Sequence, residues 1–218
     1  MKRGVLKFVA SPMNGGKTTN MLLRAKRASI LGWKVLLAKP QVDTRHKSTV
    51  IRSRCGAEME CNLCVDSQFN FAKDISYKDV DILFVDEAQF LSARQIEELR
   101  EVVDVHGISV WCYGLLTDFK KNLFVGSKRL VELCDKMYEL DVLCCFCSES
   151  GRFHLKYADG KADVSGPSID VSTPGNDKFV SVCHKCWMEK MSASEEKECA
   201  RLFCNEGVSV DKAVEING

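Results

Sequence analysis

The feature that most constrains the fold is an apolar run that passes through a glycine-containing turn into an amphipathic segment. Residues 5–10 have the length and the β-branched and aromatic content of a buried strand, and the turn SPMNGGKT follows directly at residues 11–18. Residues 18–31 then place apolar side chains on one side and basic ones on the other, and Gly32 is a stop signal. A strand, a glycine turn and a helix in this order predict an α/β fold with a phosphate-binding loop.

Other segments continue the alternation of strands and helices. An amphipathic segment begins after Ser92, whose spacing to Gln95 resembles a capping box, and another covers residues 126–137. We therefore expect a P-loop parallel sheet flanked by helices, with a ligand crevice at the carboxyl ends of the strands. Three further apolar runs have the length of buried strands: residues 34–39, 80–85 and 108–114.

The turn itself carries the residue types that bind phosphate. In a phosphate loop, backbone N–H groups and the positive end of a helix surround the phosphates, a lysine reaches the β and γ oxygens, and a hydroxyl holds Mg²⁺. The strict pattern begins with glycine, where this chain has Ser11. The alternative to a phosphate loop is that residues 11–18 form an ordinary turn between a strand and a helix. The predicted ATP and magnesium contacts in the loop are Ser11, Asn14, Gly15, Gly16, Lys17 and Thr18.

A second apolar run ends in two carboxylates, Asp86 and Glu87. In a parallel sheet these side chains lie beside the phosphate loop. Asp86 can then hold Mg²⁺ through water, and Glu87 can act as a general base. The alternative is that the two acids only favour the N-terminus of a helix.

Twelve cysteines are unusual in a chain of 218 residues, which needs no disulfides to fold. Two Cys-x-x-Cys pairs suit one tetrahedral zinc ion with no open position, so the metal would be structural. Cys145 is an alternative ligand to Cys144, and His184 is expected to be exposed. The predicted zinc ligands are Cys144, Cys147, Cys183 and Cys186.

The chain divides into three predicted parts: a P-loop nucleotide-binding domain at residues 1–142, a small zinc-binding subdomain at 143–190 and a helical tail at 191–218. Within the first part, residues 41–74 are polar and are expected to form a long irregular loop. This tract holds a third pair, Cys61 and Cys64. We interpret it as unliganded thiols, with a second zinc site as the alternative.

Composition argues against several classes of partner. The chain has 31 basic and 30 acidic residues and a net charge of +1, which is unlike a polybasic nucleic-acid binder. No apolar run approaches the roughly 18 residues of a membrane span, and the first eight residues are too polar for a signal peptide. We expect a cytoplasmic protein with no nucleic-acid partner and no membrane contact.

Five motifs occur in the order found in one enzyme family. They are SPMNGGKT at residues 11–18, PQVDTR at 40–45, DEAQF at 86–90, YGLLTDF at 113–119 and the two cysteine pairs. Together they resemble the zinc-containing thymidine kinases of bacteria, large DNA phages and animal cytosol. The resemblance covers about residues 4–190 and is closest to phage and bacterial members.

The resemblance implies ATP-dependent phosphorylation of the 5′-hydroxyl of a pyrimidine deoxynucleoside, with thymidine the first candidate, in the salvage of DNA precursors. It implies ATP, Mg²⁺ and a structural Zn²⁺ as cofactors, and a homo-oligomer, commonly a tetramer in this family. Glu87 would be the base that accepts the hydroxyl proton, and Arg45 would stabilise charge on the transferred phosphoryl group. Asp43 and Gln89 would lie among the ATP and magnesium contacts.

The resemblance also implies a nucleoside pocket that is closed by a zinc-held loop, the lasso. For Leu115 and Phe119, packing in the core is a close alternative to contact with a nucleoside. The predicted wall of the pocket consists of Met13, Phe90, Leu115, Phe119, His154 and Phe179.

Three departures from the family pattern lie where the base is read. The family has Thr at the position of His154, Tyr at that of Phe179, and Gly-Gly at that of Pro174-Gly175. Deoxyuridine and deoxycytidine therefore stay open as substrates beside thymidine.

Two other functions would leave different signatures. A nucleic-acid-dependent P-loop ATPase with a zinc ribbon would carry a basic stripe near the cysteines, whereas residues 159–177 hold more acids than bases. A non-catalytic homologue would lack Lys17 or Glu87, and both are present.

Overall fold

The computed structural model describes residues 3–41, 49–158, 161–164 and 178–192. Its main element is a sheet of six strands in the order β5-β2-β6-β7-β1-β8, and every neighbouring pair is parallel. This arrangement confirms the predicted parallel α/β fold. The strands are β1 (Leu6–Ala10), β2 (Val35–Pro40), β5 (Leu63–Val65), β6 (Ile82–Val85), β7 (Ser109–Gly114) and β8 (Lys136–Glu139).

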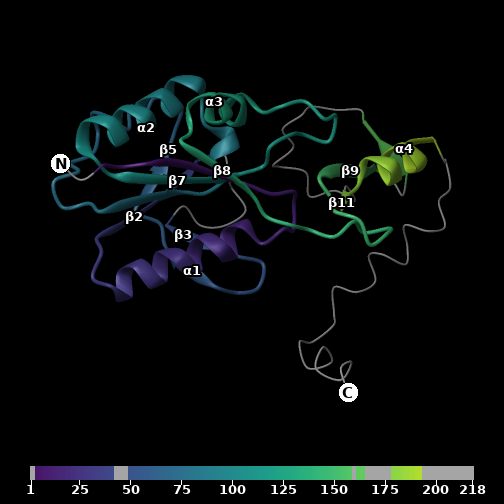
Figure 1. Ribbon diagram of the computed structural model, residues 1–218, viewed down its shortest axis with the longest axis horizontal. Coiled ribbons are helices and arrows are strands. Elements are labelled where there is room, and N and C mark those ends of the chain that lie inside the picture. The colour runs from purple at the N-terminus through teal and green to yellow at the C-terminus, as the bar shows by residue number, and fades with distance from the viewer. Residues whose placement is uncertain (1–2, 42–48, 159–160, 165–177, 193–218) are drawn as a thin grey trace, which may run out of the picture.

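Helices cover both faces of this sheet. Figure 1 shows α1 on one face and α2 and α3 on the other. A short 3-10 helix, η1, follows β6. The bounds are α1 (Lys17–Ile30), η1 (Ala88–Phe90), α2 (Ala93–His106) and α3 (Val125–Leu133).

The register of the central strands divides the core between the two faces. Leu37 of β2 pairs with Phe84 of β6, and the next pair is Ala38 with Val85. The first pair packs in the cluster under α1, and the second packs in the cluster under α2. This alternation explains why β6 is apolar along its whole length and why β2 is apolar up to Lys39.

Local signals set the ends of α2 as predicted. The Ser92 hydroxyl accepts a hydrogen bond from Gln95 N (3.2 Å), and Gln95 Oε1 accepts one from Ser92 N (3.1 Å), which completes a capping box. At the other end Gly107 adopts a left-handed conformation (φ 66°) and closes the helix.

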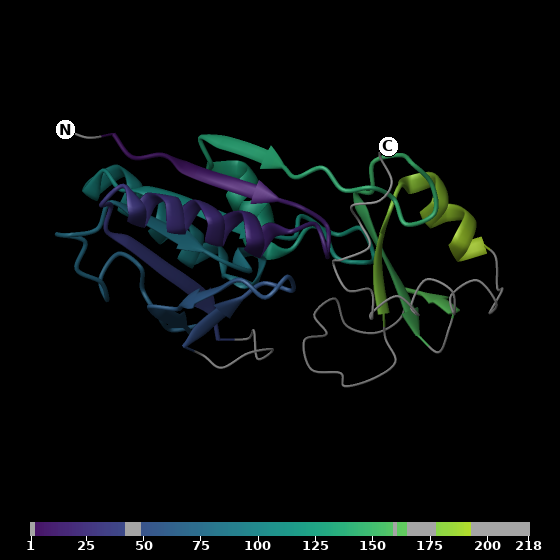
Figure 2. The ribbon, with the colours of Figure 1, turned by 90° about the horizontal axis from the view of Figure 1, so that it is seen from below.

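A second, smaller sheet lies beyond the carboxyl ends of β1 and β8 (Figure 2). It is antiparallel, in the order β10-β9-β11, and α4 packs on it. Leu155, Val182 and Trp187 are buried in its own core. The bounds are β9 (Phe153–Ala158), β10 (Lys161–Asp163), β11 (Lys178–Val182) and α4 (His184–Ser192).

Two predictions about the main part were wrong. Residues 126–137 were expected to form one helix, but α3 ends at Leu133 and β8 begins at Lys136. The four residues of β8 are all exposed at the edge of the sheet, so they carry no buried pattern that marks a strand.

The tract of residues 41–74 is also more ordered than predicted. It contains the hairpin of β3 (Val50–Arg52) and β4 (Glu58–Glu60), and β5 joins the main sheet. Strands of three residues are too short for hydrophobic periodicity to reveal. The helix predicted in the tail, at residues 194–203, lies outside the described residues. Every helix in the described ranges is too short or too polar to cross a membrane.

Candidate active site

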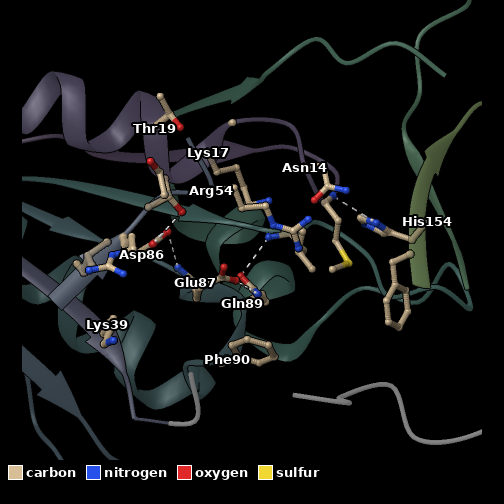
Figure 3. A pocket seen from close by; sticks show the side chains of 18 of the residues that line it. Asn14, Lys17, Thr19, Lys39, Arg54, Asp86, Glu87, Gln89, Phe90 and His154 are labelled. Atoms are coloured by element: carbon tan, nitrogen blue, oxygen red, sulfur yellow. Dashed lines mark hydrogen bonds between the residues drawn. The ribbon is translucent and has the colours of Figure 1, made fainter. Parts of the chain in front are cut away.

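A cavity of about 440 Å³ opens at the carboxyl ends of the central strands, between the phosphate loop and the second sheet. Its wall includes most of the predicted site residues, which come from separate parts of the chain (Figure 3). Ser11 and Gly15 lie behind this wall, within the loop. The predicted residues on the wall are Met13, Asn14, Gly16, Lys17, Thr18, Asp86, Glu87, Gln89, Phe90, Leu115, Phe119, His154 and Phe179.

The phosphate loop turns tightly from β1 into α1. Asn14 (φ 63°) and Gly16 (φ 74°) both take left-handed conformations. Lys17, the first residue of α1, is buried, and its Nζ donates to the carbonyl oxygens of Pro12 (3.0 Å) and Ser11 (3.3 Å). The ammonium group is therefore held within the loop, where it can meet a phosphate.

Ser11 fits at the position of the usual glycine because residue 15 has no side chain. A Cβ atom on Gly15 would lie 1.8 Å from Ser11 Oγ and 2.7 Å from Val142 Cγ2. The Ser11 hydroxyl occupies this space and donates to Pro12 O (3.0 Å). The serine thus departs from the pattern without opening the loop.

A hydroxyl and a carboxylate meet at the phosphate end of the cavity. Thr18 Oγ1 donates to Asp86 Oδ2 (3.0 Å), and Asp86 Oδ1 accepts a hydrogen bond from Glu87 N (3.1 Å). Burial, followed by the nearby charge of Glu87, raises the pKa of Asp86 to about 7. The oxygen atoms of Thr18 and Asp86 are the kind of ligand that Mg²⁺ prefers. A bound cation would also compensate the buried negative charge of Asp86.

Glu87 projects from a strained turn into the middle of the cavity. Its backbone is left-handed (φ 51°), which is unusual for a residue with a Cβ atom. Gln89 Nε2 donates to Glu87 Oε2 (2.6 Å), and Gln89 Oε1 accepts from Leu115 N (3.1 Å). Gln89 lines the cavity, as expected of a ligand contact, and its hydrogen bonds also orient Glu87 from the end of β7.

Aromatic side chains line the other end of the cavity. The rings of Phe119 and Phe179 lie 6.0 Å apart, and those of Phe90 and Phe124 meet edge to face at 6.0 Å. Phe179 belongs to β11, so the second sheet supplies part of this wall. Flat apolar surfaces of this kind suit a nucleobase.

His154 connects the second sheet to the phosphate loop. It is 2% exposed, and its Nδ1 accepts a hydrogen bond from Met13 N (3.4 Å). Ser181, its partner on β11, donates from Oγ to Met13 O (2.6 Å). Burial, followed by the positive charge of Lys17, lowers the pKa of His154 to about 4, so the ring is neutral.

The β3–β4 hairpin supplies a group of wall residues that the sequence did not reveal. Lys39 reaches the hairpin, and its Nζ donates to Val50 O (2.9 Å). Cys55 Sγ lies 3.3 Å from Thr19 Oγ1 and 3.1 Å from Ser53 Oγ, and these hydrogen bonds, that of Ser53 first, lower its pKa to about 7. The only hint in the sequence was the polarity of the tract. The hairpin residues on the wall are Val50, Ile51, Arg52, Ser53, Arg54 and Cys55.

The four predicted zinc ligands come together beside the second sheet. The Sγ atoms of Cys144, Cys147, Cys183 and Cys186 all lie within 4.8 Å of one another, and Cys147 is 3.7 Å from both Cys183 and Cys186. A tetrahedron with Zn–S bonds of about 2.3 Å has S···S edges of about 3.8 Å. Four thiolates at this spacing fit a structural zinc ion.

The other cysteines lie apart from this cluster. Cys145 N donates to Ser181 O (2.9 Å), and its thiol is not part of the group, so Cys144 is the member at this position. Cys61 is buried and its Sγ donates to Leu63 O (3.2 Å), whereas Cys64 is exposed. Among the described residues, the four-cysteine group is the one set of three or more His, Cys, Asp or Glu side chains that could share a metal ion.

Four predicted residues cannot be compared with the structure. Asp43 and Arg45 lie outside the described residues, as do Pro174 and Gly175.

Comparison with known proteins agrees with this geometry. The family model described as "Thymidine kinase" matches residues 4–187. A thymidine kinase of Encephalitozoon cuniculi is 69% identical over 97% of this chain and 100% of its own length. Those of Enterobacteria phage T4 and Photorhabdus laumondii are 37% and 33% identical over 84% and 88% of the chain, and over 94% and 96% of their own lengths. This chain belongs to the thymidine kinase family.

Proposed function

We propose that this protein transfers the γ-phosphoryl group of ATP to the 5′-hydroxyl of thymidine and so produces dTMP and ADP. The observation that carries the proposal is the order of groups along one cavity: the phosphate loop at one end, Glu87 in the middle and paired aromatic rings at the other end. A nucleoside with its base between the rings presents its 5′-hydroxyl to the phosphate end. The family relationship supports the same reaction.

The phosphate end binds ATP. Lys17 and the loop amides of Asn14, Gly15 and Gly16 surround the β and γ phosphates, and Ser11 shapes the loop from behind. Thr18 and Asp86 are the residues that would hold Mg²⁺, which neutralises phosphate charge when it is bound. The buried carboxylate of Asp86 gains a counter-charge in this way.

Glu87 accepts the proton of the attacking hydroxyl. The hydrogen bond from Gln89 fixes the orientation of the Glu87 carboxylate. A base that is already oriented loses less conformational entropy on the way to the transition state. The resemblance also implies roles for Asp43 and Arg45 in phosphoryl transfer, in which a guanidinium stabilises charge on the equatorial oxygens.

The zinc-binding part holds the nucleoside side of the cavity. A zinc ion on the four thiolates ties the start of this part to α4, and thereby supports His154 and Phe179. We divide the chain at residues 142 and 190, as the sequence predicts. We also propose a cytoplasmic location, where thiols stay reduced, and a homo-oligomer.

The test measures transfer of labelled phosphate from ATP to a panel of nucleosides. Glu87→Gln should lower turnover by roughly 10² to 10⁴-fold and leave the Kd for ATP unchanged, because only proton transfer is lost. Glu101→Gln, an exposed change on α2, is the matched control. Near-normal turnover in Glu87→Gln would remove Glu87 as the base.

The alternative of a nucleic-acid-dependent ATPase is not favoured, since the relatives are thymidine kinases along most of the chain. Stimulation of ATP hydrolysis by single-stranded DNA, without phosphorylation of any nucleoside, would overturn the proposed kinase.

A further inference from the structure

Nδ1 of His154 accepts a hydrogen bond from Met13 N, and its other ring nitrogen, Nε2, is left for the cavity that the residue lines. We infer that His154 is a specificity-determining residue: its Nε2–H donates a hydrogen bond to the 4-carbonyl oxygen of a uracil-type base and thereby favours thymidine and deoxyuridine over deoxycytidine. This inference rests on the proposed nucleoside kinase activity. It assigns base selection to a side chain of β9.

The hydrogen bond from Met13 determines the tautomer of the ring. A backbone N–H can only donate, so the nitrogen that meets it, Nδ1 of His154, must carry no proton. A neutral imidazole has one protonated nitrogen, which is then Nε2. The Ser181 hydroxyl donates to the carbonyl oxygen of the same residue, Met13, so both backbone polar groups of Met13 are bound to the second sheet.

The donor at Nε2 is available to a ligand. His154 is 2% exposed, and its carbonyl oxygen accepts from Trp187 Nε1 (3.1 Å), which holds this part of β9 in place. Within the described part of the chain, no protein group forms a hydrogen bond with Nε2. Among the described residues, no side-chain N or O atom is both fully buried and without a partner, so Nε2 is open to the cavity that His154 lines. A ligand in this cavity can supply the acceptor.

The position of His154 in the cavity indicates which part of the ligand it meets. Figure 3 shows His154 on the side of the cavity opposite Asp86, with Glu87 between them. The 5′-hydroxyl must lie near Glu87, so the atoms of the pyrimidine furthest from the sugar extend toward His154. The group at position 4 lies across the ring from the sugar bond. It is a carbonyl in thymine and uracil, which accepts, and an amino group in cytosine, which presents a second donor.

The test compares kcat/KM for thymidine, deoxyuridine and deoxycytidine in the wild type and two variants. The wild type should have a higher kcat/KM for thymidine and deoxyuridine, which have a carbonyl at position 4, than for deoxycytidine. In His154→Leu this ratio of kcat/KM values should fall by at least about tenfold. His154→Gln is the matched variant, because a carboxamide can accept from Met13 N and donate into the cavity; it should keep most of the preference. The Kd for ATP and the free energy of unfolding show whether each variant is folded.

The outcomes separate this inference from the proposed function. An unchanged preference in a folded His154→Leu variant overturns the role of His154 while the kinase stands, and a wild type that phosphorylates no nucleoside overturns the kinase itself. If the leucine variant does not fold, ¹⁵N spectra of the wild-type imidazole decide. The proton must reside on Nε2 and its signal must shift when thymidine binds; a proton on Nδ1, or no shift, overturns the inference.

Discussion

The hydroxyl of Thr18 donates a hydrogen bond to the buried carboxylate of Asp86 across 3.0 Å and so joins the first turn of α1 to the end of β6. Asp86→Asn should lower Mg²⁺-dependent turnover by at least about tenfold, because an amide is a poor ligand for the metal. Steady-state kinetics over a range of Mg²⁺ concentrations would measure the loss.

The same carboxylate predicts a pH dependence of stability in the absence of nucleotide. Its pKa is raised to about 7, so the folded state binds more protons than the unfolded state between the ordinary aspartate value and 7. The free energy of unfolding of the wild type should therefore fall relative to Asp86→Asn as the pH rises through this window. Denaturant unfolding of both proteins at several pH values measures this change. If the free energy of unfolding of the wild type rose relative to that of Asp86→Asn as the pH increased, the prediction would be wrong.

The fit of Ser11 against Gly15 predicts a specific steric effect. Gly15→Ala should destabilise the loop and weaken ATP binding, because the new Cβ overlaps Ser11 Oγ and Val142. Adding Ser11→Gly should recover part of the loss, since it removes one of the two obstacles. Gly56→Ala is the control: Gly56 has φ +87° but open space around it, so strain alone should cost about 1 kcal/mol and ATP affinity should not change. Equal effects at both glycines would contradict the steric argument.

Two arginines on the hairpin differ in how they are engaged. Arg52 forms an ion pair with Glu58 (2.6 Å), whereas the described contacts include no ion pair of Arg54, which lines the same cavity. Arg54→Ala should raise the KM for ATP by about fivefold, and this effect should shrink at high salt, because it removes a cation that can meet the triphosphate. Arg52→Ala should change the KM by less than about twofold, since its charge is already compensated. Equal changes in the two variants would show that Arg54 has no special role.

The zinc cluster predicts a spectroscopic change at Trp187. This side chain is buried beside Cys186, and its Nε1 donates to His154 O (3.1 Å). We expect about one zinc ion per chain. Removal of the metal should shift the emission of Trp187 to longer wavelength and abolish nucleoside turnover, while ATP still binds, because the phosphate loop belongs to the other sheet. A Trp187→Phe variant assigns the signal, and unchanged emission after metal removal would argue against the site.

The lowered pKa of His154 predicts how acid affects the fold. Its value of about 4, against an ordinary value of 6.5, means that the unfolded state binds the proton more readily. Relative to His154→Gln, the wild type should keep its full stability above pH 6.5 and lose up to roughly 3 kcal/mol as the pH falls from 6.5 to 4. Urea unfolding of both proteins across this range measures the difference; a constant difference would contradict the buried neutral ring.

Local patterns predicted the parts of the fold that depend on neighbours in the chain. The strand before Ser11, the helix predicted at residues 18–31 and the capping box of Ser92 each involve residues only a few positions apart. The structure confirms them, with α1 at Lys17–Ile30. The exposed strand β8 and the three-residue strands of the hairpin were not predicted, because pairing with distant segments forms them.

The sequence by itself determined the parallel α/β fold and the family, and it placed the four cysteines of the thiolate cluster, because these depend on short motifs with fixed spacing. Only the tertiary structure decided that Gln89 orients Glu87, that Cys144 rather than Cys145 joins the thiolate cluster, and that Met13 meets His154. The reason is physical: a hydrogen bond or a shared cavity depends on distances in space, and Met13 and His154 are 141 residues apart in the chain.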